Sequence, residues 1–172
     1  HAADNYLQKL LNQGIKIALC EQMKPAIAWK IVERKLTRII TPGTRLAENQ
    51  IEANRNQFLL ALEFTKTQTH LAWLDLTTGT FSIATDESHE NLTPLIESLA
   101  PKEILIPEKS SGSWTQTENP WCDSFQYLKQ NYSLTTIPDY HFDPIAGART
   151  TCDTLDVLNL NGFGITDQHP AL

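Results

Sequence analysis

Residues 57–84 read QFLLALEFTKTQTHLAWLDLTTGTFSIA and contain three apolar runs that short polar segments separate. The first run, Gln57 to Phe64, has a large apolar side chain at every even position, as expected for a strand with one buried face. His70 to Leu76 and Thr80 to Ala84 are the second and third runs, and Thr77-Thr-Gly79 is short enough to form a tight turn between them. The stretch therefore predicts an antiparallel meander of three strands.

Helices and strands alternate after the meander. Ser88 is a suitable N-cap for a helix in which Leu92, Leu95, Ile96 and Leu99 have helical spacing. The sequence then predicts a strand over Glu103–Pro107, a loop at Ser110–Ser113, a helix over Trp121–Asn131, a strand over Leu134–Ile137 and a helix over Pro144–Leu158. Three antiparallel strands followed by α-β-α-β form the ribonuclease H-like arrangement. The predicted fold class is therefore α/β, an α+β mixture with a mixed five-stranded sheet.

A smaller set of elements precedes residue 57. Apolar residues at helical spacing before Gly14 predict an amphipathic helix over residues 3–13. Ile15–Cys20 predicts a strand in which Cys20 is a small core residue. Val32–Ile40 predicts a second strand, although Ile31 and Ile39 fall outside its alternation. A turn is expected at Thr41-Pro-Gly-Thr44 and a polar linker at residues 45–56.

The charge of the chain changes sign along its length. Residues 1–47 hold eight Lys/Arg and three Asp/Glu, whereas residues 48–172 hold six Lys/Arg and seventeen Asp/Glu. This asymmetry favours two units with different partners, and only the first has the sign that binds a polyanion. No apolar run approaches the roughly 18 residues of a membrane helix, so no membrane partner is expected. Three dispersed cysteines favour a reduced, cytosolic protein.

Cations are concentrated in the predicted strand at residues 32–40, as Arg34, Lys35 and Arg38. In a regularly alternating strand Arg34 and Arg38 point the same way, which would present two guanidinium groups to successive DNA phosphates. The alternative is a solvated edge strand whose charges prevent aggregation. Composition alone leaves both interpretations open.

A ribonuclease H-like order also raises the possibility of a metal-dependent nuclease, because such folds can hold two metal ions between carboxylates. Glu63, Glu97 and Glu108 fall near the expected positions, but an acidic half supplies such coincidences readily. The histidines are dispersed and no C-x-x-C pair occurs, so no metal site is expected. No G-x-x-x-x-G-K-[ST] phosphate loop is present, which places any ATPase outside these residues. Packing is the expected role of the four tryptophans, Trp29, Trp73, Trp114 and Trp121.

Several ordered motifs identify a family. The chain resembles the MutS family of DNA mismatch-repair proteins in Ile17-Ala-Leu-Cys-Glu-Gln22, Val32-Glu-Arg-Lys35, Arg38-Ile39, Thr41-Pro-Gly-Thr44, Asp75-Leu-Thr-Thr-Gly79 and Gly162-Phe-Gly-Ile165. The resemblance implies that residues 1–44 are the C-terminal part of the mismatch-recognition domain. It also implies a linker at 45–56 and a truncated, ribonuclease H-like connector domain at 57–172.

The resemblance carries expectations about function. The full-length protein is expected to be a bacterial, cytoplasmic, nucleoid-associated dimer that binds mispaired or looped double-stranded DNA. Its DNA-dependent ATPase domain, outside this chain, would use ATP or ADP with Mg²⁺, and its connector would recruit MutL. No catalysis and no cofactor are expected in this chain. By resemblance Arg34 is the best candidate for a DNA-backbone contact, followed by Lys35 and Arg38. The Phe-x-Glu wedge of the family does not occur in the sequence. A module that only docks MutL, or a nuclease, remains the alternative.

Overall fold

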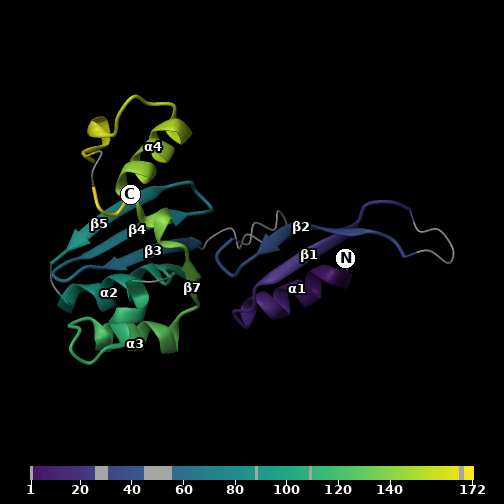
Figure 1. Ribbon diagram of the computed structural model, residues 1–172, viewed down its shortest axis with the longest axis horizontal. Coiled ribbons are helices and arrows are strands. Elements are labelled where there is room, and N and C mark those ends of the chain that lie inside the picture. Colours follow the sequence, from purple (N-terminus) through teal and green to yellow (C-terminus); the bar gives the residue numbers. More distant parts are fainter. Residues whose placement is uncertain (1, 26–30, 45–55, 88, 109, 167–168) are drawn as a thin grey trace. The chain divides into compact units, whose positions relative to one another are not determined.

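The computed structural model describes residues 2–25, 31–44, 56–87, 89–108, 110–166 and 169–172, which belong to two compact units (Figure 1). The units are His1–Gln50 and Ile51–Leu172, and each is described by itself. Trp29, residues 45–55 of the expected linker and the N-cap expected at Ser88 lie outside the described residues. None of the described helices has the length and apolarity to cross a membrane.

The first unit consists of α1 (Ala2–Asn12) and an antiparallel pair of strands, β1 (Ile17–Gln22) and β2 (Arg34–Ile40). Gly14, at φ 76°, follows α1 and donates its N–H to the Leu11 carbonyl at 3.0 Å, as the sequence predicts for a glycine cap. Among the described residues of this unit, the buried hydrophobic side chains are Leu11 and Ile40. The unit therefore has a very small core.

The β1–β2 pair contains one irregularity, at Thr37. Cys20 pairs with Leu36 and the neighbouring Leu19 pairs with Arg38, so Thr37 is an extra residue on β2. Its hydroxyl donates to the Leu19 carbonyl at 3.2 Å. An extra residue of this kind is a β-bulge, and it reverses which face the following side chains occupy.

Five strands form the sheet of the second unit, in the order β5-β4-β3-β6-β7. The central strand β3 pairs antiparallel with β4, which pairs antiparallel with β5; on its other side β3 runs parallel to β6, and β6 runs parallel to β7. This is a mixed five-stranded sheet in the ribonuclease H-like order, and the predicted α/β fold class is confirmed. The strands are β3 (Phe58–Phe64), β4 (Thr69–Asp75), β5 (Phe81–Asp86), β6 (Glu103–Pro107) and β7 (Leu134–Ile137).

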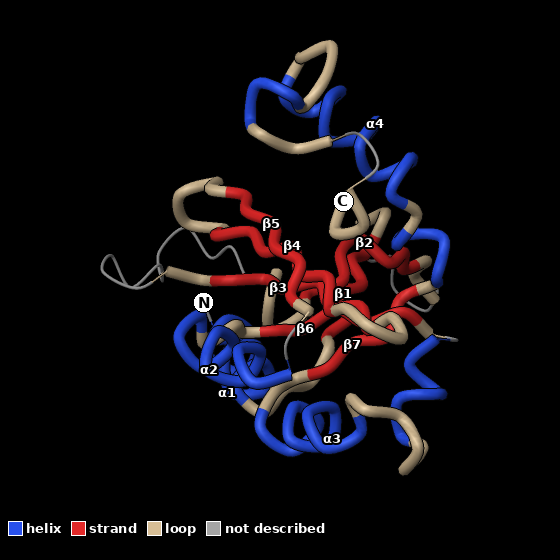
Figure 2. Tube along the Cα trace, turned by 90° about the vertical axis from the view of Figure 1, so that its left-hand side faces the viewer, coloured by secondary structure: helices blue, strands red, loops and turns tan. Residues whose placement is uncertain are grey.

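Helices α2 (His89–Leu99) and α3 (Cys122–Asn131) cover one face of this sheet, and α4 (Pro144–Leu155) lies on the other side, farther from the strands (Figure 1). Three short 3-10 helices complete the unit: η1 (Ser110–Thr115), η2 (Asp139–Phe142) and η3 (Asn161–Phe163). Figure 2 shows the same separation of α3 and α4 from the side. η2 and the segment at Pro170–Leu172 lie against the second face of the sheet.

The main core lies between the sheet and the α2–α3 layer. Leu60, Leu62 and Phe64 of β3 point into it, as their alternation predicts, and meet Leu92 and Ile96 of α2. Trp114 and Trp121 are buried in the same core, and Trp73 packs against it, which confirms the packing role predicted for these three tryptophans. The opposite face of the sheet is more polar, because it carries Glu63, His70, Glu103 and Thr135.

Three local predictions need correction. Residues 110–113 are not an open loop but the start of η1, which brings Trp114 into the core. α4 ends at Leu155, three residues before the predicted end, because Asp156 adopts a left-handed conformation and its N–H bonds the Cys152 carbonyl. Cys20 is exposed rather than part of a core.

Candidate functional site

The candidate DNA-contacting residues lie on β2, and all three are exposed. Arg34 is opposite Gln22 and Lys35 is opposite Glu21, whereas Arg38, beyond the bulge, is opposite Leu19. The prediction that Arg34 and Arg38 share a face is therefore wrong, because the extra residue Thr37 shifts the alternation by one. Lys35 and Arg38 share one face, and Arg34 lies on the other.

The face of Arg34 is also the more open one. Along β2 it continues with Leu36 and Ile39, which are 55% and 59% exposed, whereas Ile40 on the opposite face is 8% exposed. Leu36 and Ile39 share the open face at a spacing of three residues, which the extra residue Thr37 allows, because a regular strand would place them on opposite faces.

The three acids considered for a nuclease do not come together. Glu63 is half-buried on the polar face of the sheet, whereas Glu97 is on α2, in the layer that covers the opposite face. The Glu97 carboxylate accepts a hydrogen bond of 2.5 Å from the Tyr127 hydroxyl of α3, which raises the pKa of Tyr127 to about 12. Glu108 is exposed after β6. Among the described residues, no group of three His, Cys, Asp or Glu side chains is placed to hold a metal ion.

Glu63 instead lines a small cavity on the polar face of the sheet. Its volume is about 190 Å³, and it lies between β3, β4, η2 and the segment at Pro170–Leu172. Glu63 is paired in register with His70, whose ring nitrogen Nδ1 is 3.1 Å from the Thr85 hydroxyl. Burial, then the charge of Asp139, raises the pKa of Glu63; burial, then His169, lowers the pKa of His70. Both shifts favour the uncharged forms, as expected for a structural site inside the unit.

Asp75 anchors the turn that joins β4 to β5. Its carboxylate accepts hydrogen bonds from the Gln57 N–H, from the N–H and hydroxyl of Thr77, and from the Thr78 hydroxyl, at 2.7–3.2 Å. Burial alone would raise the pKa of Asp75, but these hydrogen bonds outweigh it and lower the pKa to about 2. Gly79 follows at φ 72°, a conformation that suits glycine. The Asp-Leu-Thr-Thr-Gly motif is therefore a structural turn.

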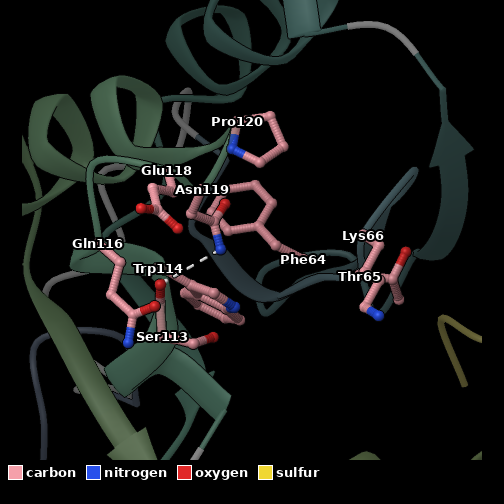
Figure 3. A pocket seen from close by; sticks show the side chains of 9 residues that line it. All are labelled: Phe64, Thr65, Lys66, Ser113, Trp114, Gln116, Glu118, Asn119 and Pro120. Atoms are coloured by element: carbon pink, nitrogen blue, oxygen red, sulfur yellow. Dashed lines mark hydrogen bonds between the residues drawn. The ribbon is translucent and has the colours of Figure 1, made fainter.

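A larger pocket of about 510 Å³ opens beside the carboxyl end of β3 (Figure 3). Phe64, Thr65 and Lys66 form one side, and η1 with the following turn to Pro120 forms the other. The sequence alone does not predict this pocket, because Trp114 was expected only to pack in the core. The signal available in the sequence was the pair of tryptophans on either side of a polar, Asn-Pro-containing turn, Trp114 to Trp121.

The order of its strands makes the second unit a ribonuclease H-like α/β unit, and a basic helix–hairpin unit precedes it in the chain. The sequence matches the families described as MutS domain I, over residues 1–49, and MutS domain II, the connector domain, over residues 57–172. The chain therefore belongs to the MutS family.

Two curated relatives illustrate this membership. The chain is 30% identical over 170 residues to the DNA mismatch repair protein MutS of Lachnoclostridium phytofermentans, with 97% of the chain covered. It is 34% identical over 164 residues to the protein of the same name from Thermodesulfovibrio yellowstonii, with 95% covered. In both comparisons the chain spans 17% of the relative's length.

Proposed function

We propose that this chain is the part of a DNA mismatch-recognition protein that joins the rear of the DNA-reading domain to the connector. The observation that carries the proposal is the match to MutS domains I and II in succession. The full-length protein would be a dimer in the bacterial cytoplasm that binds mispaired or looped duplex DNA. A domain outside these residues would bind ATP or ADP with Mg²⁺ and signal to MutL through the connector.

The DNA contact within this chain would come from β2. Arg34, Lys35 and Arg38 are exposed, and phosphate contacts position a protein on DNA without reading its sequence. Because the bulge places Arg34 on one face and the other two cations on the opposite face, a DNA backbone that lies on one face meets only one set. Arg34 is the preferred contact, in agreement with the family resemblance.

This contact can be tested in the full-length protein. Arg34→Ala should weaken binding to matched and G·T-mismatched duplexes alike and should reduce the salt slope of the binding constant by about 1. Lys35→Ala and Arg38→Ala should have smaller effects. Arg149→Ala, which removes the same charge from an exposed position on α4, is the matched control. A salt slope that is unchanged by Arg34→Ala would remove Arg34 from the interface.

The chain by itself should bind DNA weakly and without mismatch preference, because the Phe-x-Glu wedge is not in its sequence. Fluorescence anisotropy of residues 1–172 with matched and G·T-mismatched duplexes measures both properties. A clear preference for the mismatched duplex would mean that these residues contain a mismatch-reading element of their own.

The connector part of the proposal concerns a protein partner. Residues 57–172 hold five Lys/Arg and fifteen Asp/Glu, and so large an excess of negative charge opposes DNA binding. If the connector docks MutL, purified MutL should bind residues 1–172 in the absence of DNA. We do not propose a nuclease, because Glu63, Glu97 and Glu108 lie on separate parts of the unit.

A further inference from the structure

The pocket at the end of β3 has preformed walls. The Phe64 ring stacks on Trp121 with centroids 4.9 Å apart and meets Trp114 edge-on at 4.8 Å. The Trp121 indole N–H donates to the Thr65 carbonyl at 2.8 Å, and Asn119 accepts from the Trp121 backbone N–H at 2.9 Å. Aromatic packing and hydrogen bonds thus hold both sides of the pocket in place.

One donor at this pocket is unused. Trp114 is 2% exposed, and its indole N–H has no hydrogen-bond partner among the described residues, in contrast to that of Trp121. In the described part of the chain, the one fully buried side-chain polar atom without a partner is the Thr69 hydroxyl. The Trp114 N–H therefore reaches solvent, and Figure 3 shows its nitrogen edge turned toward the open middle of the pocket. A buried indole N–H usually has an acceptor, so a molecule that enters the pocket can supply one.

The surroundings of this donor define the chemistry of the acceptor. The rings of Phe64 and Phe125 pack against Trp114, so little of its surface is free for stacking a planar ligand. The exposed Lys66 and Glu118 lie across the pocket from each other (Figure 3). A site with an indole donor and the Gln116 amide between a cation and an anion suits a polypeptide, which has regularly spaced carbonyl groups and can carry both charges.

Nucleic acid is a poor candidate because of the charge of the whole unit. Ten more acids than bases in residues 57–172 repel a phosphate backbone, and Glu118 adds a negative charge at the pocket itself. A protein segment of low net charge meets no such penalty.

We propose that this pocket binds a loop or extended segment of a partner protein, which places a backbone carbonyl on the Trp114 N–H and a carboxylate beside Lys66. The inference rests on the proposed function, in which the connector docks a protein. Glu118 sets the direction of the segment by favouring a basic or hydrogen-bond-donating group at its other end.

The test uses residues 1–172 and, as the probe, purified MutL. Trp114→Phe removes the donor but keeps an aromatic ring in the core, and it should weaken binding about three- to tenfold, as one hydrogen bond allows. Lys66→Ala should weaken binding two- to fivefold and reduce its salt dependence. Lys129→Ala, at an exposed position on α3, should leave binding unchanged.

A direct readout accompanies the binding assay. In ¹H–¹⁵N spectra the Trp114 indole resonance should exchange with water faster than that of Trp121 and should shift when MutL is added. If MutL binds but Trp114 does not shift and neither variant weakens binding, the pocket assignment is overturned while the docking function stands. If MutL does not bind residues 1–172 at all, both the docking function and this occupant of the pocket are rejected.

Discussion

The two units of this chain bury their β-strands to different extents. The five-stranded sheet of the second unit has the α2–α3 layer on one face, η2 and the segment at Pro170–Leu172 against the other, and buries leucine, isoleucine and tryptophan side chains completely. The β1–β2 pair of the first unit has only α1 beside it among the described elements, and its open face leaves Leu36 and Ile39 more than half exposed. A two-stranded hairpin of this kind has little stability of its own.

The two units also differ in the burial of their charged side chains. Every charged side chain described in the first unit is exposed, including the cations of β2. The second unit buries Asp75 and Glu103 at 2% and 1% exposure and provides Asp75 with four hydrogen bonds. The first unit therefore offers its charges to a ligand, whereas the second uses several of its charges to hold its own turns and strands.

The largest expected effect compares one residue type on a strand of each unit. Leu60→Ala on β3 removes a fully buried side chain and should lower the free energy of unfolding by about 2–5 kcal/mol. Leu36→Ala on β2 should change it by about 0.5 kcal/mol or less, because Leu36 is 55% exposed. Urea denaturation of residues 1–172, followed by far-ultraviolet circular dichroism, gives both values. Equal losses would show that the open face of β2 is buried in solution.

A second prediction concerns the buried charge of Asp75. Asp75→Asn removes the negative charge on which four hydrogen bonds converge and replaces Oδ2, the acceptor for the Thr78 hydroxyl, by an amide NH₂ group; it should cost about 2–3 kcal/mol at pH 7. Asp153→Asn, at an exposed position on α4, should cost about 0.5 kcal/mol or less.

The contribution of Asp75 should also depend on pH. The native pKa is lowered from 3.8 to about 2, so the stabilisation is complete above about pH 4 and is lost as the pH falls toward 2. The difference in unfolding free energy between the original chain and Asp75→Asn should shrink over that interval. A difference that stays constant from pH 5 to pH 2 would mean that the carboxylate charge contributes nothing to the turn.

Much of the second unit was predictable because its signals are local. β6 and β7 begin and end at the predicted residues, since Glu103–Pro107 and Leu134–Ile137 are short runs rich in β-branched and apolar residues that polar residues or a proline bound on either side. The alternation along β3 also identified its buried face correctly. Such patterns act through the period of the strand itself, so no knowledge of distant residues is needed.

The features that escaped prediction depend on distant partners. The bulge at Thr37 exists only as a difference in the number of residues between the paired segments of β1 and β2, which β2 alone does not show. The pocket beside Trp114 needs Phe64, which is 50 positions away, and the separation of Glu63 from Glu97 follows from the layer to which each element belongs. One-dimensional spacing carries no information about such convergence.

The smallest effect tests whether the second unit tolerates a buried polar group only where that group is paired. Thr69 and Thr135 are both buried on the five-stranded sheet, but Thr135 donates to the Glu103 carboxylate and the Thr69 hydroxyl has no partner among the described residues. Replacement by valine keeps the shape and removes the hydroxyl. Thr69→Val should therefore raise the free energy of unfolding by about 0.5–1 kcal/mol, because it removes an unsatisfied group from the core.

Thr135→Val is the matched variant and should change stability in the opposite direction. It leaves the buried Glu103 carboxylate without one of its donors and should cost about 1–2 kcal/mol. Thermal and urea denaturation of the two variants measure the two signs directly. Destabilisation by Thr69→Val would show that its hydroxyl has a partner in solution, such as an ordered water, and that the core beside Phe64 is less dry than its aromatic packing indicates.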